Sequence, residues 1–200
     1  MPVLTEETAN PDPLAQFTLW FEDAKAAGAP EPNAMAVATV GPDGAPSLRM
    51  VLLKGHGEDG FVFYTNYGSR KARELEQNAR VALLFFWPTL QRQVRVEGRV
   101  ARTSRDESAE YFRTRVRGAQ VGAWASAQSE VITTREALEA RVAELEEEYA
   151  DREIPVPPFW DGFRVTPSRY EFWQGREHRL HDRLVYERDG ARWKIARLSP

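Results

Sequence analysis

The stretch AMAVATVGPDGAPSLRMVLLKGHGEDGFVFYTN (residues 34–66) decides the fold of this 200-residue chain. Its three apolar runs have the composition and alternation of β-strands, and the glycine-containing turns GPDG and GEDG separate them. Turns this short join antiparallel strands, because a parallel connection needs a crossover of about a dozen residues. The stretch therefore predicts an antiparallel meander.

Helices are expected on both sides of the meander. Asp12 can cap a helix that begins at the following proline, and Ser69 can cap a short helix directly after the last strand. A further helix is predicted for residues 106–115. Thr133 and Glu136 form a capping box ahead of a longer, acidic helix.

Further strands are predicted downstream for residues 81–88 and 92–103. Three C-terminal segments, 163–175, 183–190 and 192–200, alternate in the same way, and a hairpin turn at Asp189 and Gly190 joins the last two. No alternation of strand and helix typical of a parallel sheet is visible. The sequence thus predicts a mainly β protein, an antiparallel β-barrel, closed or partly open, with flanking α-helices.

Composition supports one globular domain. The chain is 42% hydrophobic and 28% charged, and 200 residues can bury a substantial core. We expect a single domain over residues 12–200 after a flexible N-terminal arm of residues 1–11.

The chain has no cysteine, which excludes disulfides, thiolate metal sites and a thiol nucleophile. The sequence shows neither a leader pattern nor an apolar run of membrane-spanning length, which predicts a cytoplasmic protein.

Charge patterning points to small anionic ligands. The net charge of -3 argues against a nucleic-acid binder, whereas arginines gather in RTRVRG (113–118) and GSRK (68–71). In YTNYGSRK (64–71) a predicted strand runs through a turn into a helix that opens with Arg70 and Lys71. Free backbone N–H groups, a hydroxyl and two cations around one point are typical of a phosphate site.

The stretch EFWQGREHRLHDR (171–183) contains an H-x-x-H pair, His178 and His181. A metal enzyme is one reading, but residues three apart on a strand face opposite sides, and further ligands would be needed. If the segment is extended, Arg179, His181 and Arg183 share a face instead. We expect no metal, and we expect His178, like His56 in its glycine-rich turn, to be an ordinary polar residue.

Six stretches together carry a resemblance to a known family. They are RMVLLK (49–54), FVFYTNYGSRKARELEQN (61–78), QRQVRVEGR (91–99), YFRTR (111–115), GAWASAQS (122–129) and FWQGREHRLHDR (172–183). In this order and spacing the chain resembles the pyridoxamine 5′-phosphate oxidase family from about Asp12 to Pro200. The resemblance implies an FMN-binding split barrel with a C-terminal dimerisation region, and a homodimer with FMN between the subunits.

The resemblance also implies which residues hold the flavin. One subunit would supply Arg49, Met50, Val51, Leu52, Leu53, Lys54, Tyr64, Thr65, Arg70, Lys71 and Gln93. The partner chain would supply Gln128, Ser129, Trp173 and Arg183.

By the same resemblance, Arg179 and His181 are the expected catalytic residues, Arg179 over the reacting face of the substrate and His181 near its ring hydroxyl. The substrate-binding positions implied by the family are Lys54, Tyr111, Arg115, Ala119, Arg179, Leu180 and His181. Ala119 stands where the family commonly has a serine near the substrate phosphate, so one hydrogen-bond donor is missing there.

The function implied is an FMN-dependent oxidase of vitamin B6 metabolism. It would convert pyridoxamine 5′-phosphate or pyridoxine 5′-phosphate to pyridoxal 5′-phosphate, with dioxygen as acceptor and hydrogen peroxide as product. Two alternatives stay open: an FMN oxidase of the same fold acting on another substrate, such as a phenazine precursor, and a non-enzymatic flavin- or pyridoxal-phosphate-binding protein.

Overall fold

The computed structural model describes residues 3–190 and 192–200. The helices are α1 (Pro13–Ala26), α2 (Arg70–Gln77), α3 (Arg105–Thr114), α4 (Arg117–Ala125) and α5 (Arg135–Glu148). The strands are β1 (Ala34–Val40), β2 (Pro46–Leu52), β3 (Gly55–Gly57), β4 (Gly60–Asn66), β5 (Arg80–Trp87), β6 (Arg92–Arg102), β7 (Trp160–Gln174), β8 (Asp182–Asp189) and β9 (Arg192–Arg197). Short 3-10 turns occupy Pro88–Leu90 and Glu177–Arg179.

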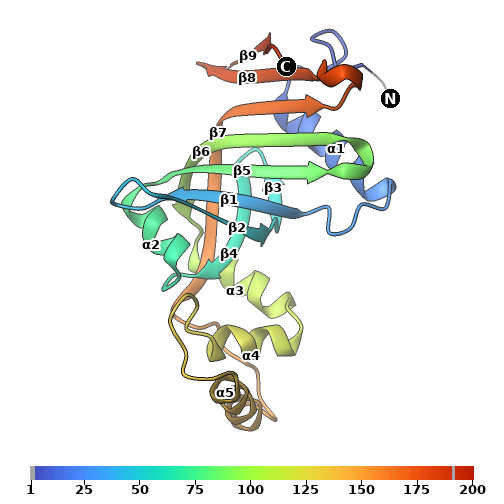
Figure 1. Ribbon diagram of the computed structural model, residues 1–200. Coiled ribbons are helices and arrows are strands. Elements are labelled where there is room, and N and C mark those ends of the chain that lie inside the picture. The colour runs from blue at the N-terminus through green and yellow to red at the C-terminus, as the bar shows by residue number, and fades with distance from the viewer. Residues whose placement is uncertain (1–2, 191) are drawn as a thin grey trace.

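The strands of the described residues form one nine-stranded sheet in the order β2-β1-β5-β6-β7-β4-β3, with β8 paired to β7 and β9 to β8. Every pairing is antiparallel. The sheet curls into a half-barrel with helices on its flanks (Figure 1). The predicted mainly β, antiparallel barrel with flanking helices is confirmed.

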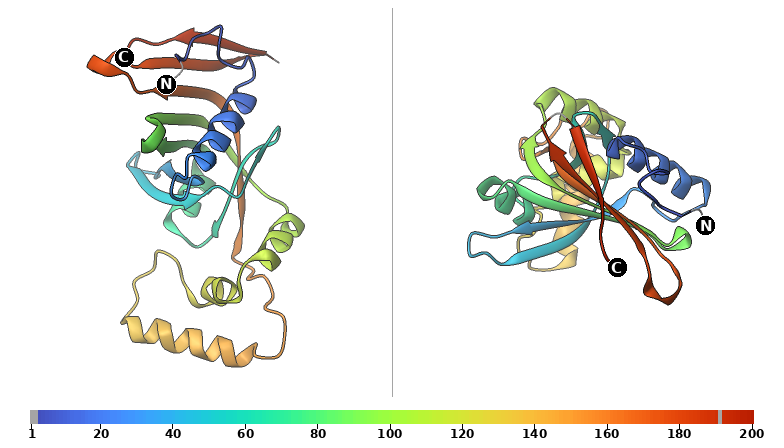
Figure 2. Two further views of the ribbon diagram at one scale, coloured as in Figure 1. Left: turned by 90° about the vertical axis from the view of Figure 1, so that its right-hand side faces the viewer. Right: turned by 90° about the horizontal axis from the view of Figure 1, so that it is seen from above.

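Strand β7 connects the parts of the molecule because it pairs with β6, β4 and β8. It runs from the helices α3, α4 and α5 at one end to the β8–β9 hairpin at the other (Figure 2). The register between β6 and β7 shifts at Gly98, where a Cβ would lie only 2.2 Å from the carbonyl oxygen of Thr166. A side chain at position 98 would therefore push the two strands apart at this bulge.

Helix α1 forms where it was predicted and packs across the barrel. Asp12 accepts hydrogen bonds from the backbone N–H groups of Leu14 and Ala15 and so caps the helix. Phe17 is fully buried, with its ring 4.8 Å from that of Phe61 and 4.9 Å from that of Phe85. These edge-on aromatic contacts join α1 to β4 and β5 in the main core.

A second, smaller core lies under α3, α4 and α5, and its buried members include Phe112, Val121, Leu145 and Trp160. Helix α4 was not predicted, because its sequence RGAQVGAWA holds two glycines and buries only Val121. The capping prediction for α5 was one residue off.

Thr134, not Thr133, caps α5, through a bond from the backbone N–H of Ala137. The predicted strand over residues 46–55 is divided into β2, which pairs with β1, and the short β3, which pairs with β4. The expected meander is therefore two hairpins at opposite ends of the strand order.

The N-terminal residues that the structure describes lie beside β8 and β9, at the same end as the C-terminus (Figure 1). Leu4 is buried, and Glu6 pairs with Arg197 at 2.9 Å. The hydroxyl of Tyr186 donates to the carbonyl oxygen of Asn10 at 2.8 Å. Residues 1–2 of the predicted flexible arm lie outside the described residues, and the mobility of the remainder stays a prediction, as does the boundary at residue 12.

Candidate active site

A cleft of about 1010 Å³ opens between β2, β4, the start of α2 and the α3–α4 region. It brings together most of the positions predicted to bind cofactor and substrate. Those that line it are Arg49, Met50, Val51, Leu52, Lys54, Tyr64, Thr65, Arg70, Lys71, Tyr111, Arg115, Ala119, Gln128 and Ser129. Leu53, which follows the last residue of β2, is not among them, because its side chain is buried in the main core and is 4% exposed.

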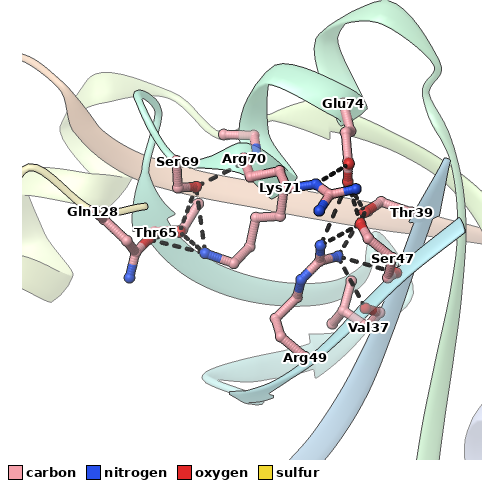
Figure 3. Close-up of polar contacts among 11 residues, drawn as sticks. Val37, Thr39, Ser47, Arg49, Thr65, Ser69, Arg70, Lys71, Glu74 and Gln128 are labelled. Atoms are coloured by element: carbon pink, nitrogen blue, oxygen red, sulfur yellow. Dashed lines mark hydrogen bonds and ion pairs between the residues drawn. The ribbon is translucent and has the colours of Figure 1, made fainter. Parts of the chain in front are cut away.

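Lys71 forms the buried cationic centre of this cleft (Figure 3). Its Nζ donates to Thr65 Oγ1 and Gln128 Oε1, both at 2.9 Å, and to Ser69 Oγ at 3.3 Å. All three oxygens are neutral, so burial, together with the charge of Arg49, lowers the pKa of Lys71 to about 8. An ammonium group that is desolvated beside neutral oxygens is well placed to bind an anion.

Helix α2 brings its N-terminus to the same place. Ser69 caps it, as predicted, by accepting from the backbone N–H of Ala72. The cap side chain is fully buried, so the helix start and its free N–H groups are held at the end of β4. The strand–turn–helix stretch thus supplies the phosphate-binding geometry expected from YTNYGSRK.

Two arginines next to Lys71 are held by one buried carboxylate, Glu74, which the sequence analysis missed (Figure 3). Arg70 Nε donates to Glu74 Oε1 at 2.8 Å, and Arg49 Nη2 lies 3.4 Å from Oε2. The hydroxyls of Thr39 and Ser47 each accept from Arg49 and donate to Glu74 Oε2. The i, i+4 spacing of Arg70 and Glu74 is the one signal in the sequence that could have suggested this pair.

The network decides the protonation of Glu74. Burial alone would raise the pKa of its carboxyl, but the bonds from Ser47, Thr39 and Arg70 outweigh burial and lower the pKa to about 2. Glu74 is therefore an anion at neutral pH. It orients both guanidinium groups along the wall of the cleft.

Another part of the cleft is aromatic and holds two further cations. The rings of Tyr64 and Tyr111 stack at 4.2 Å, and the ring of Trp160 stacks on Tyr64 at 5.2 Å. The guanidinium of Arg115 lies 4.8 Å from the Trp160 ring, and Lys54 Nζ lies 5.8 Å from the Tyr111 ring. Trp160 lines the cleft but was absent from the predicted set.

Arg115 is incompletely satisfied. Its Nη1 is buried and has no hydrogen-bond partner within the described part of the chain. Burial lowers the pKa of this guanidinium. Since buried donors in folded proteins are almost always paired, this nitrogen calls for an acceptor that a ligand in the cleft could supply.

The other predicted site residues form a separate group that does not line the cleft. Gln93 on β6 lies opposite Trp173 on β7, which in turn lies opposite Arg183 on β8. The ring of Trp173 is 4.6 Å from that of His181. Arg183 is held by the buried carboxylate of Glu171 at 2.8 Å.

Within one chain, the structure groups the predicted flavin-site residues differently from the expectation, and the chain that would supply each of them stays a prediction. Gln93 was expected beside Lys71 but shares a row with Trp173 and Arg183. Gln128 and Ser129 were expected from the partner chain, yet both line the cleft of their own chain, and Gln128 bonds directly to Lys71. The motifs gave the residues but could not assign them to halves of a site.

The expected extended conformation of residues 175–181 is also wrong. Strand β7 ends at Gln174 and β8 begins at Asp182, with a 3-10 turn between them. The positive φ angles of His178 (54°) and Arg179 (63°) break the alternation from which we inferred a shared face. His181 accepts a hydrogen bond at Nδ1 from the backbone N–H of Arg176 at 3.1 Å, so the neutral ring carries its proton on Nε2.

A metal site finds no support at the H-x-x-H pair. Among residues 3–190 and 192–200, no group of three or more His, Asp or Glu side chains is arranged to hold a metal ion. In the same part of the chain, no helix is both long enough and apolar enough to span a membrane.

The curled antiparallel sheet with flanking helices defines the split barrel found in FMN-binding proteins. A pyridoxamine 5′-phosphate oxidase-related, FMN-binding protein of Nostoc punctiforme has a TM-score of 0.76 with this chain and covers 94% of it, while this chain covers 98% of that structure. The two are 17% identical, so this likeness concerns the fold.

The family follows from the sequence comparisons. Residues 21–149 match the family model of pyridoxamine 5′-phosphate oxidase, and residues 160–200 match that of the pyridoxine 5′-phosphate oxidase C-terminal dimerisation region. The chain belongs to the pyridoxamine 5′-phosphate oxidase family.

Named relatives of the family cover nearly the whole chain. The pyridoxine/pyridoxamine 5′-phosphate oxidase of Rubrobacter xylanophilus is 62% identical over 98% of this chain and 91% of its own length. The protein of that name from Burkholderia multivorans is 58% identical over 98% and 93%. PhzG from Burkholderia lata, solved with tetrahydrophenazine-1-carboxylic acid, is 33% identical, with a TM-score of 0.93 over 99% of this chain and 98% of its own.

The Glu74 network makes a prediction about acid stability. The carboxyl pKa is about 2 in the folded chain against an ordinary 4.5, so the stabilisation is complete above about pH 4.5 and is lost as pH falls toward 2. Glu74→Gln should lower the free energy of unfolding at pH 7 by roughly 2 kcal/mol. It should also flatten the loss of stability between pH 4.5 and 3, as measured by urea unfolding at several pH values.

The matched control is Glu76→Gln on the exposed side of the same helix, where an ion pair with Arg102 should contribute less than about 1 kcal/mol. Equal effects of the two substitutions at pH 7 would contradict the role of the buried network.

Proposed function

We propose that this chain is an FMN-dependent oxidase that converts pyridoxamine 5′-phosphate or pyridoxine 5′-phosphate to pyridoxal 5′-phosphate. The observation that carries the proposal is that two cations without a carboxylate partner line one cleft. Lys71 is buried among neutral oxygens, and Arg115 keeps a buried nitrogen that is unpaired within the described residues. A phosphorylated cofactor beside a phosphorylated substrate needs two such cations, with stacked aromatic rings between or beside them.

The residues that would hold FMN fit its phosphate. Lys71, the start of α2 and the arginines fixed by Glu74 would bind it by charge-assisted hydrogen bonds, and β2 with Gln128 and Ser129 would complete this chain's half of the site. When bound, FMN would supply a two-electron acceptor that dioxygen can reoxidise.

The reaction balances with water and dioxygen. Pyridoxine 5′-phosphate and dioxygen give pyridoxal 5′-phosphate and hydrogen peroxide. For pyridoxamine 5′-phosphate, one water is also consumed and ammonia is released. The chain's own residues would bind and orient the substrate so that its C4′ hydrogen faces the flavin.

Lys54, Tyr111 and Arg115 would hold the substrate phosphate in this model of the site. Lys54 Nζ lies over the ring of Tyr111, which stacks on Tyr64. Ala119 lines the same end of the cleft without a hydroxyl, so the substrate phosphate would be bound there by cations and not by an added serine donor. Arg179 and His181 would reach the substrate from the other chain, with the Nε2 proton of His181 available to an oxygen of the ring.

The second group of residues gives the physical reason for a homodimer. Gln93, Trp173 and Arg183 lie away from the cleft of their own chain, so in a dimer they would complete the cleft of the partner. The outward faces of β2 and β5 expose large apolar side chains, among them Leu48, Met50 and Phe86. A continuous apolar face of this kind is typical of a subunit interface, and the match to a C-terminal dimerisation region agrees with it.

A second candidate function is oxidation of a phenazine precursor. The likeness to PhzG and the missing hydroxyl at Ala119 favour it, whereas the relatives at 52–62% identity all carry the B6 oxidase name. A carrier of flavin or pyridoxal phosphate without turnover is a third outcome of the tests below. The cytoplasmic location stays a prediction.

The substrate assignment can be tested with a peroxide-coupled assay. With FMN present, the two phosphorylated B6 vitamers should be oxidised and their unphosphorylated forms should be poor substrates. Arg115→Met should raise KM for pyridoxamine 5′-phosphate about 10- to 100-fold, because a charged hydrogen bond contributes roughly 1.5–3 kcal/mol. The control is Arg113→Met, which changes an exposed arginine two residues earlier, in the last turn of α3, and should leave KM unchanged.

Turnover of a dihydrophenazine carboxylic acid in place of the B6 vitamers would favour the second candidate. Flavin binding without oxygen consumption on any of these compounds would indicate a carrier.

The lowered pKa of Lys71 predicts the pH dependence of FMN binding. Below pH 8 the ammonium is already charged in the free chain, whereas above pH 8 binding must take up a proton. FMN affinity should therefore weaken above pH 8, by up to about tenfold per pH unit, as measured by quenching of flavin fluorescence from pH 7 to 9.5. In Lys71→Met the affinity should be lower and this slope should vanish; an equal slope in both proteins would show that Lys71 is not the titrating group.

The dimer can be tested through Phe86, which is 56% exposed on β5 and does not line the cleft. Phe86→Glu should give a monomer in gel filtration and should lose FMN, because each cleft would lack the partner's residues. Leu19→Glu, at an equally exposed position on α1, should stay dimeric and yellow. An active Phe86→Glu monomer with bound FMN would refute the shared site.

A further inference from the structure

The segment between β7 and β8 carries the predicted catalytic residues in an unusual backbone conformation. His178 and Arg179 are consecutive, and both have positive φ, 54° and 63°, which side chains with a Cβ rarely adopt. One backbone bond inside the turn, from Leu180 N–H to the Glu177 carbonyl at 3.1 Å, is a small local compensation. The conformation therefore has to be held from outside the turn.

Asp182, the first residue of β8, closes this segment. Its Oδ2 accepts from Arg176 Nε at 2.7 Å, and its Oδ1 accepts from Arg197 Nη1 at 3.1 Å. Arg176 also donates its backbone N–H to His181 Nδ1. The side chain of Arg176 is thus bound to Asp182, and its backbone N–H is bound to His181. These two hydrogen bonds join the two ends of residues 176–182.

The carboxylate of Asp182 is 13% exposed and stays charged. Burial raises its pKa, but the bonds from Arg176, the Leu4 backbone and Arg197 prevail and lower it below the usual range. The contacts of Asp182 with Arg176 and Arg197 are therefore ion pairs across the pH range in which an oxidase would be assayed.

The same carboxylate connects the segment to the beginning of the chain. The backbone N–H of Leu4 donates to Asp182 Oδ2 at 3.4 Å, and Arg197 donates to the Leu4 carbonyl at 3.0 Å. Arg197 also pairs with Glu6 at 2.9 Å. Residues 4–6 therefore contact the segment through two intermediates, Asp182 and Arg197.

We propose that Asp182 is a positioning residue for the oxidase reaction. It holds residues 176–181 in the conformation that presents Arg179 and His181, and it links that conformation to residues 4–6 through Arg197. The inference rests on the proposed function, because Arg179 and His181 are the groups that would face the substrate. Asp182 itself acts through them and through Arg176.

The first test measures the segment directly and needs neither flavin nor turnover. Hydrogen exchange followed by mass spectrometry on the full chain should show faster exchange of residues 175–182 in Asp182→Asn, by about tenfold or more, with β6 and β7 unchanged. Asp189→Asn, at the exposed far end of the same strand, should exchange like the wild type. Unchanged exchange in Asp182→Asn would overturn the proposal.

The second test separates positioning from folding. Asp182→Asn should bind FMN in the wild-type ratio and remain dimeric, while kcat per bound flavin falls about 10- to 100-fold, as expected for a misplaced reacting group. KM for pyridoxamine 5′-phosphate should stay within about threefold of the wild-type value. The reason is that Arg115 and Lys54, which line the cleft and lie outside residues 176–182, would hold the substrate phosphate. A kcat within twofold of wild type, or a loss of flavin that accounts for the whole defect, would overturn the proposal.

Glu6→Gln tests the link to the N-terminal residues. It should speed exchange in residues 175–182 by less than Asp182→Asn does, since Arg197 keeps its bond to Asp182. No change would remove residues 4–6 from the inference. A wild-type protein that oxidises no B6 vitamer would refute the proposed function alone, since the exchange measurements would still decide whether Asp182 holds the segment.

Discussion

The pairing of β7 is the constraint on which the rest of the structure depends. This one strand of 15 residues pairs with β6 and β4 to close the half-barrel, and with β8 to extend it. Its first residue, Trp160, lies in the aromatic end of the cleft, and Trp173, near its last residue, lies in the row with Gln93 and Arg183. A single strand therefore fixes both groups of predicted site residues. The bulge opposite Gly98 is what allows it to bend between them.

Buried carboxylates determine which cations remain available to a ligand. Glu74 holds Arg49 and Arg70, Glu171 holds Arg95 and Arg183, and Asp182 holds Arg176 and Arg197. Each carboxylate limits the cost of bringing like charges together and fixes planar guanidinium groups in place. Lys71 and Arg115 are different, because the partners of Lys71 are neutral and one nitrogen of Arg115 is unpaired in the described residues. These two residues would therefore add cations without a carboxylate partner to the other cations proposed to bind the two phosphates.

The elements with strong local signals could be predicted from the sequence. The strands within residues 34–66, the caps Asp12 and Ser69 and the antiparallel barrel all follow from alternation and turn chemistry, and the structure confirms them. The single meander expected for residues 34–66 is wrong, because β1–β2 and β3–β4 are two separate hairpins. Helix α4 could not be predicted, because its glycines weaken the helical pattern and tertiary packing of Val121 has to compensate. The turn at His178 and Arg179 was missed because two non-glycine residues in left-handed conformation have no sequence signature. The assignment of Gln93 and Gln128 to different halves depends on strand register and long-range hydrogen bonds, which motifs along one chain do not encode.

A site divided between two chains has a thermodynamic consequence. If flavin binds only where the cleft of one chain meets the Trp173 and Arg183 row of another, then each bound flavin stabilises the dimer by mass action. In the isolated chain, Lys71 has only neutral oxygens as partners, and the apolar side chains Leu48, Met50 and Phe86 are exposed. Dimerisation would bury the apolar face, and cofactor binding would neutralise the cation. Dimerisation and flavin binding would then be thermodynamically linked, so that each would raise the apparent affinity of the other.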